Sequence, residues 1–186
     1  MNSIREAKQM LSELETKSTF EKMVKVSAIL TKLLESKQIR PVIVGGLAVE
    51  IYTRSDYTTV DIDLIISDRK LAGEILEQLG FTVEGRHWYH EKLLVSIEIP
   101  NDMLEDADYR KVTELQIDSE MSVYVIGIED IILDRLRACV HWKSTSDCEW
   151  GQRMFLLHYE RLDLIYMKEM AKKDLTNELL DQWLLN

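Results

Sequence analysis

Two aspartates one residue apart within an apolar run constrain this chain more than any other feature. The segment Asp61 to Ile66 is typical of a β-strand, on which side chains alternate faces, so Asp61 and Asp63 share a face about 6.6 Å apart at Cα. Carboxylates are rarely buried in apolar surroundings without a partner, and this pair can lean together onto a divalent cation. The alternative is that both aspartates face water while Ile62 and Leu64 face the core.

A second feature precedes this strand. Residues 41–44 are apolar and rich in β-branched side chains, and they end in Gly45 and Gly46. Without a Cβ, two successive glycines let backbone N–H groups approach an anion closely, and a helix that follows them would begin at that anion. An ordinary turn explains the two glycines equally well when they are taken alone. Strand, turn, helix and aspartate strand together over residues 41–66 indicate a site that handles phosphate with a metal ion.

Composition and charge limit the class of protein. The chain has 186 residues, 46% of them hydrophobic, which is enough to bury a substantial core in one α/β domain or in a domain with a helical appendage. No stretch approaches 18 consecutive apolar residues and the N-terminus lacks an apolar signal region, so we expect a soluble, cytoplasmic protein without a membrane partner. The net charge of −10 argues against broad nucleic-acid binding, which needs clustered cations.

The two cysteines give no metal or disulfide pattern. Cys139 and Cys148 lack the paired spacing of a zinc site or of a disulfide framework. We therefore expect two reduced thiols.

The periodicity of the chain changes after Gly127. Before it, the pattern predicts an α/β core with a mixed sheet over residues 1–127; after it, an all-helical region over residues 128–186 that packs on the core. Ser18 and Glu21 form a capping-box pattern, and Gly80 is a helix stop. The expected helices are 4–14, 18–36, 69–79, 129–142, 147–158, 161–171 and 174–185, and the expected strands after the aspartate strand begin at Phe81 and cover 86–91, 92–99, 112–117 and 121–126.

A third carboxylate lies on one of these later strands. In Val95 to Ile99 apolar residues alternate with Ser96 and Glu98, so Glu98 is the single carboxylate on the polar face. An exposed glutamate on a half-buried strand is the plain alternative. The aspartate pair upstream favours Glu98 as a third metal ligand.

These motifs resemble the nucleotidyltransferase superfamily, with its polymerase-beta-like fold. In that superfamily an apolar strand ends in Gly-Gly or Gly-Ser, and a short helix leads to a strand with D-x-D. Residues 45–49 and 59–63 are most similar to the small bacterial AbiEii-like and DUF6036-like branches, although the spacing from Gly46 to Asp61 is slightly long. The resemblance implies that Asp61, Asp63 and Glu98 bind Mg²⁺ or Mn²⁺, and that Gly45, Gly46 and Thr59 contact the nucleotide.

The resemblance extends to the first helix of the C-terminal region. It implies that Arg135 takes the place of a lysine that faces the nucleotide phosphates, with Lys143 and Asp147 near a second polar cluster. An intrahelical ion pair, for example with Glu129, is the alternative reading of Arg135.

The activity implied by the resemblance is transfer of a nucleoside monophosphate from an NTP to a hydroxyl acceptor. An antibiotic-like small molecule, a protein hydroxyl and a tRNA end all remain as acceptors. So does a toxin role with a separate antitoxin as partner. A nucleotidyltransferase fold that only binds or regulates, without turnover, is the alternative function.

Overall fold

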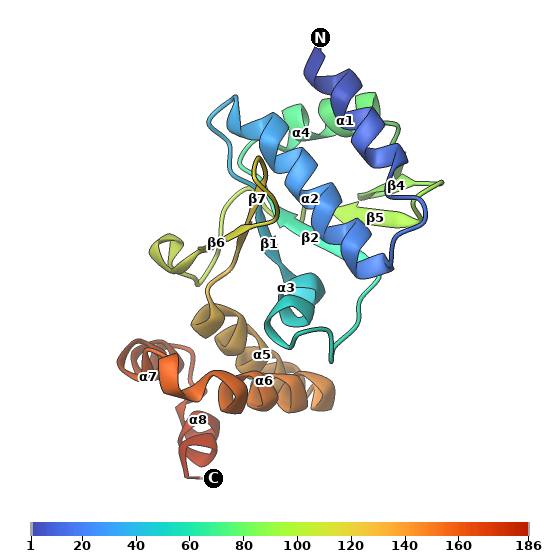
Figure 1. The fold of residues 1–186 in the computed structure, drawn as a ribbon. Helices are drawn as coiled ribbons and strands as arrows, with labels where there is room; N and C mark the ends of the chain where they lie inside the picture. Colours follow the sequence, from blue (N-terminus) through green and yellow to red (C-terminus); the bar gives the residue numbers. More distant parts are fainter. Residues whose placement is uncertain (1, 186) are drawn as a thin grey trace.

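The computed structural model describes residues 2–185 as one α/β body with a helical C-terminal part (Figure 1). The helices are α1 (Asn2–Ser12), α2 (Thr19–Glu35), α3 (Gly45–Tyr52), α4 (Arg69–Leu79), α5 (Ile128–Trp142), α6 (Thr145–His158), α7 (Leu164–Lys173) and α8 (Asn177–Leu184), with 3₁₀ turns η1 (Tyr109–Lys111) and η2 (Tyr159–Arg161). The strands are β1 (Val42–Val44), β2 (Asp61–Ile65), β3 (Thr82–Glu84), β4 (His87–His90), β5 (Val95–Glu98), β6 (Thr113–Gln116) and β7 (Ser122–Val125).

The strands form one mixed sheet in the order β3-β4-β5-β2-β1-β7-β6. β1 runs antiparallel to β2 and parallel to β7, while β2 runs parallel to β5. The hairpin β4–β5 and the hairpin β6–β7 extend the sheet on its two sides. The predicted mixed sheet with flanking helices is therefore confirmed.

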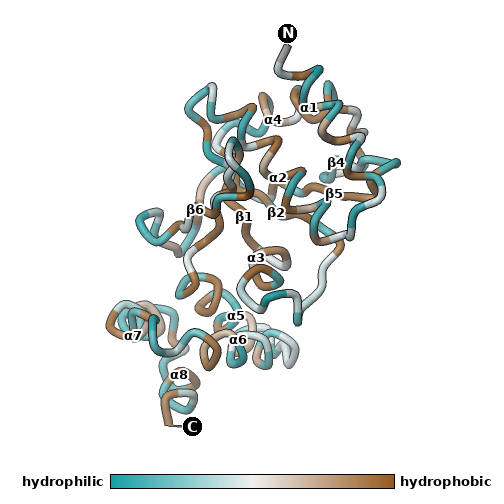
Figure 2. The backbone as a smooth tube through the Cα atoms, in the orientation of Figure 1, coloured by the Kyte–Doolittle hydropathy of each residue, from teal (hydrophilic) through white to brown (hydrophobic). Residues whose placement is uncertain are grey.

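Helices cover one face of the sheet. α2 packs against β2, β5 and β7, and α1 and α4 lie beside it in the same layer (Figure 1). In Figure 2 the backbone of β1 is drawn as hydrophobic, whereas β4 and much of the loop backbone are drawn as hydrophilic. The face of β2 that carries its aspartates is turned away from α2.

Local sequence signals explain where several elements begin and end. The Ser18 side chain accepts a hydrogen bond from the Glu21 N–H, and the Glu21 carboxylate accepts one from the Ser18 N–H, so the predicted capping box starts α2. Gly80 has a left-handed backbone with φ of 100° and ends α4, as predicted. These are interactions between residues close in sequence, which is why the pattern alone locates them.

The helical C-terminal part begins at Ile128, immediately after Gly127. α5 packs against α3, α6 and α7. The helical part therefore lies at the end of the sheet that is next to α3 (Figure 1). In the described range 2–185, no helix combines the length and the apolar character needed to cross a bilayer.

The expectation of two free thiols is wrong in this structure. Cys139, near the end of α5, and Cys148, in the first turns of α6, form a disulfide with their Cα atoms 4.7 Å apart. The sequence separation of nine residues gave no recognisable motif, but the α5–α6 turn folds the two helices together and brings the sulfurs into bonding distance.

Candidate active site

The aspartates of β2 lie on the predicted face. Ile62 and Leu64 are fully buried under the helices, whereas Asp61 and Asp63 are only partly buried on the opposite face. The alternation predicted for this strand is confirmed, because period-two side-chain direction is a property of any extended chain.

The Gly45 turn packs directly against Asp63. Gly45 has a left-handed φ of 59°, and a Cβ added there would lie 2.9 Å from the Asp63 Cγ, so no other residue fits without displacing the carboxylate. The N–H of Gly46, in the first turn of α3, donates a hydrogen bond to the Asp63 carboxylate. The end of β1, the start of α3 and the middle of β2 therefore meet at one point.

Thr59 occupies the other side of this turn. A Cβ on Gly46 would lie 2.8 Å from the Thr59 Oγ1, and that oxygen also accepts a hydrogen bond of 3.4 Å from the Asp61 N–H. The sequence did not point to the residue that holds Thr59: the Glu50 carboxylate, 4% exposed, accepts the Thr59 N–H at 3.1 Å. A single glutamate in an otherwise apolar helix segment is the signal that marks Glu50.

Glu98 lies next to Asp63 in the sheet. The two residues are register partners on the parallel strands β5 and β2, which places their side chains on one face. Glu98 is engaged elsewhere, however: its Oε1 lies 3.0 Å from the Arg86 Nε, and its Oε2 lies 3.7 Å from the His87 Nδ1. The third carboxylate is thus adjacent to the pair but held by two basic side chains.

The electrostatics of Asp63 reflect this crowding. Burial, followed by the negative charges of Glu98 and Asp61, raises the pKa of Asp63, while the Gly46 N–H and Arg135 act in the opposite direction. A divalent cation would remove the repulsion that raises this pKa, and carboxylate oxygens are the ligands that Mg²⁺ and Mn²⁺ prefer. The donor set therefore fits such an ion through Asp61 and Asp63.

The fit of the third ligand is incomplete. Within residues 2–185, no three histidine, cysteine or acidic side chains gather closely enough to enclose a metal ion. Glu98 lies within ion-pair distance of Arg86 and His87, and it would have to leave these side chains to join a cation held by the aspartates.

A cleft of about 470 Å³ opens at this point of the sheet. Gly45 and Asp63 form part of its floor, the segment 100–105 forms one wall, and Asp134 of α5 lies on the opposite wall. Asp134 and Glu105 were not singled out from the sequence, because nothing local relates them to β2. The cleft is thus bounded by the sheet and by the helical part, as expected for a site between them.

Arg135 points to a partner within the helical part. Its Nη1 lies 2.6 Å from the Asp147 Oδ1 of α6, and its Nε lies 3.6 Å from the Asp134 Oδ2. The intrahelical pair with Glu129 does not form; Glu129 instead contacts Lys111. Arg135 is near enough to lower the pKa of Asp63, so its charge still acts on the site.

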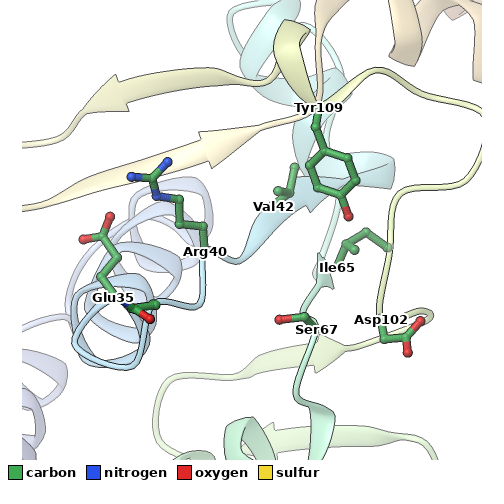
Figure 3. A pocket seen from close by; sticks show the side chains of 8 residues that line it. Glu35, Arg40, Val42, Ile65, Ser67, Asp102 and Tyr109 are labelled. Carbon is green, nitrogen blue, oxygen red and sulfur yellow. The ribbon is translucent and has the colours of Figure 1, made fainter.

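A second cavity, of about 570 Å³, adjoins the cleft along β1 and β2. Both cavities are lined by Ile65. Figure 3 shows Glu35 and Arg40 on one side of this cavity and Ser67 and Asp102 on the other, with the Tyr109 ring over the strands. Of the aspartate pair, Asp63 is among the residues that line the cleft, and Asp61 lines neither cavity.

The sequence matches one known protein family. The family described as "Nucleotidyltransferase of unknown function (DUF6036)" matches residues 21–186. No protein with a curated description matches the sequence.

Two solved structures share the fold. One is the crystal structure of an antigenic nucleotidyltransferase-like protein from Paracoccidioides brasiliensis, with a TM-score of 0.56 at 17% identity over 86% of this chain and 92% of that chain. The other is the solution structure of the antibiotic-resistance factor ANT(2'')-Ia, with a TM-score of 0.50 at 14% identity over 82% of this chain and 91% of that chain. At these identities the similarity concerns the fold alone.

Proposed function

Because this chain belongs to the DUF6036 family of nucleotidyltransferases of unknown function, we propose that it transfers a nucleoside monophosphate from an NTP to a hydroxyl acceptor, with Mg²⁺ or Mn²⁺ as cofactor. The observation that supports the proposal most directly is the packing of the Gly45 turn against Asp63 beside the cleft. In the reaction, a bond forms between the acceptor oxygen and the α-phosphorus. The bond between the α-phosphorus and the oxygen that bridges it to the β-phosphate breaks, and pyrophosphate leaves.

Each predicted site residue has a proposed role. Asp61 and Asp63 would hold the cation, and a bound cation would supply positive charge to the triphosphate. The Gly45–Gly46 turn seats the phosphates at the start of α3, and Thr59 borders the nucleotide there. Glu98 would join the aspartates as a third ligand if it left Arg86 and His87, and its carboxylate would accept the proton of the acceptor hydroxyl.

The acceptor is proposed to bind in the cleft or in the second cavity, which have Ile65 in common. An antibiotic-like small molecule, a protein hydroxyl and a tRNA end are the acceptor classes to test. The similarity of fold to an antibiotic-resistance factor is a reason to test the first class first. A toxin role would be tested by co-expression with the protein encoded beside it, which should restore growth if it is an antitoxin.

Metal-dependent binding of an NTP is the first test. Thermal melts with each of the four NTPs, in Mg²⁺, in Mn²⁺ and in chelator, should show stabilisation by at least one NTP only when the metal is present. At a ligand concentration 100 times the dissociation constant the gain is about 2.7 kcal/mol, which corresponds to a rise in Tm of roughly 5 to 10 °C for a chain of this size. Identical melts under all conditions would contradict the proposal.

Arg135→Ala is expected to weaken NTP binding by on the order of 1.5 to 3 kcal/mol, because a charge-assisted contact to phosphate is lost. Asp147→Ala is the matched control, since it removes the same 2.6 Å ion pair but keeps the guanidinium. Calorimetry with Mn²⁺-NTP separates the two roles. If both variants bind NTP like the parent, or both lose affinity equally, the role of Arg135 is structural.

A module without turnover is the second candidate, and two ion pairs favour it. Arg86 engages Glu98 and Asp147 engages Arg135, so two of the proposed functional side chains already have partners in the folded chain. Binding of Mn²⁺-NTP without release of pyrophosphate, in the presence of all three acceptor classes, would support this alternative.

A further inference from the structure

A third cavity lies at the other end of α3 from the cleft. It encloses about 530 Å³ and is lined by Arg54, which follows α3, and by the segment 156–161, which joins the end of α6 to η2. None of these residues belongs to the site described above. The inference drawn from this cavity is therefore independent of the proposed function.

His158 forms the buried base of this cavity. Its ring is 6% exposed, and its Nε2 lies 2.8 Å from the carbonyl oxygen of Tyr52. A carbonyl oxygen can only accept, so Nε2 carries the proton and donates it. The other ring nitrogen, Nδ1, then accepts from the Arg161 Nε at 3.2 Å. These two contacts indicate that the His158 imidazole is neutral and that it lies against the Arg161 guanidinium.

One guanidinium, that of Arg161, contacts this imidazole, and a second, that of Arg54, lines the same cavity. Burial, and then the positive charges of Arg161 and Arg54, lower the pKa of His158, and no carboxylate contributes to that shift. Arg54 extends from a turn in which its own backbone φ is 54°, and this turn directs it to the same cavity as Arg161. Like charges are thus held near one another, which is unfavourable unless an anion lies between them.

Five other arginines of the chain have carboxylate partners, whereas Arg5, Arg40 and Arg69 form no ion pair within residues 2–185. Arg86, Arg110, Arg135, Arg137 and Arg153 each form an ion pair. Over the described residues, Arg54 and Arg161 form none, although Glu160 also lines the cavity. Arg161 directs both its Nε and its Nη2 at the His158 Nδ1, so the donors left for an external acceptor are its other N–H groups and those of Arg54.

We propose that Arg54 and Arg161 form a binding site for a phosphate group, on the base provided by His158. Guanidinium groups bind phosphate through paired N–H donors, which makes phosphate a better match than a halide. Leu156, Leu157 and Tyr159 lie exposed beside the two arginines, so the cavity can also cover an apolar or aromatic group attached to that phosphate. The ligand class is a phosphomonoester, and free phosphate is its minimal form.

Binding should be measured by calorimetry with inorganic phosphate and with phenyl phosphate, in chelator and at constant ionic strength. We expect Arg54→Gln and Arg161→Gln each to weaken phosphate binding at least fivefold. Arg153→Gln, which removes an exposed arginine of α6 paired with Glu149, should bind as the parent does. Asp63→Asn should also bind as the parent does, which separates this site from the cleft.

The His158 ring gives a second readout that does not depend on variants. Its ¹⁵N resonances should shift on addition of phosphate and stay unchanged on addition of the same concentration of chloride. Tighter binding of phenyl phosphate than of free phosphate would identify an ester as the ligand, and equal binding would identify phosphate itself. Absence of a His158 shift, or equal phosphate binding by Arg54→Gln and the parent, would overturn the proposal.

Discussion

Asp63→Asn is expected to raise the free energy of unfolding of the metal-free protein by about 0.5 to 2 kcal/mol at pH 7. Burial, Glu98 and Asp61 raise the pKa of Asp63 above its ordinary 3.8, so the folded state holds this proton more tightly than the unfolded chain does. The stability of the parent therefore falls as the pH rises from the ordinary pKa to the raised one, and it stays low above that window. The extra stability of Asp63→Asn over the parent is therefore complete at a pH above the raised pKa, and it disappears at a pH below the ordinary pKa.

Urea melts between pH 3 and pH 8 in chelator measure this difference. Asp181→Asn is the control, because Asp181 is exposed on α8. Excess Mg²⁺ with NTP should stabilise the parent and leave Asp63→Asn unchanged, and nucleotidyl transfer should be abolished in the variant. A variant less stable than the parent in chelator at pH 7 would show that Asp63 serves the fold, as acceptor for the Gly46 N–H, rather than a metal.

Opening the Cys139–Cys148 disulfide is expected to lower the free energy of unfolding by about 2 to 3 kcal/mol. The bond closes a loop between residues nine apart, and the chain-entropy relation gives about this value for a loop of that length. For a chain of this size the corresponding fall in Tm is roughly 5 to 10 °C. The same bond joins α5 to α6, next to the ion pair of Arg135 with Asp147, so NTP binding should be measured in both redox states.

Thermal melts of the parent with and without a phosphine reductant, after titration of free thiols in denaturant, test this prediction. Cys148→Ser should melt at the temperature of the reduced parent and should not respond to the reductant. Two titratable thiols in the air-oxidised parent, or melts that do not change on reduction, would contradict it.

Interactions between neighbours in sequence determined much of the fold. The capping box at Ser18, the stop at Gly80 and the two faces of β2 follow from hydrogen bonds within four residues or from strand geometry, so pattern alone located them. The sequence also predicted a Gly-Gly turn before the aspartate strand, and the pairing of β1 with β2 brings Gly45 against Asp63.

Only the tertiary structure decided which partner each charged side chain and each thiol meets. Glu98 meets Arg86, Arg135 meets Asp147, and the two cysteines meet each other across the α5–α6 turn. The burial of Glu50 against Thr59 and the presence of Arg54 and Arg161 at one cavity also depend on how α3 packs on the sheet and on α6. A polar side chain can pair with many other polar groups. Which partner it meets is determined by the packing of the apolar core, because that packing brings together segments that no local sequence pattern relates.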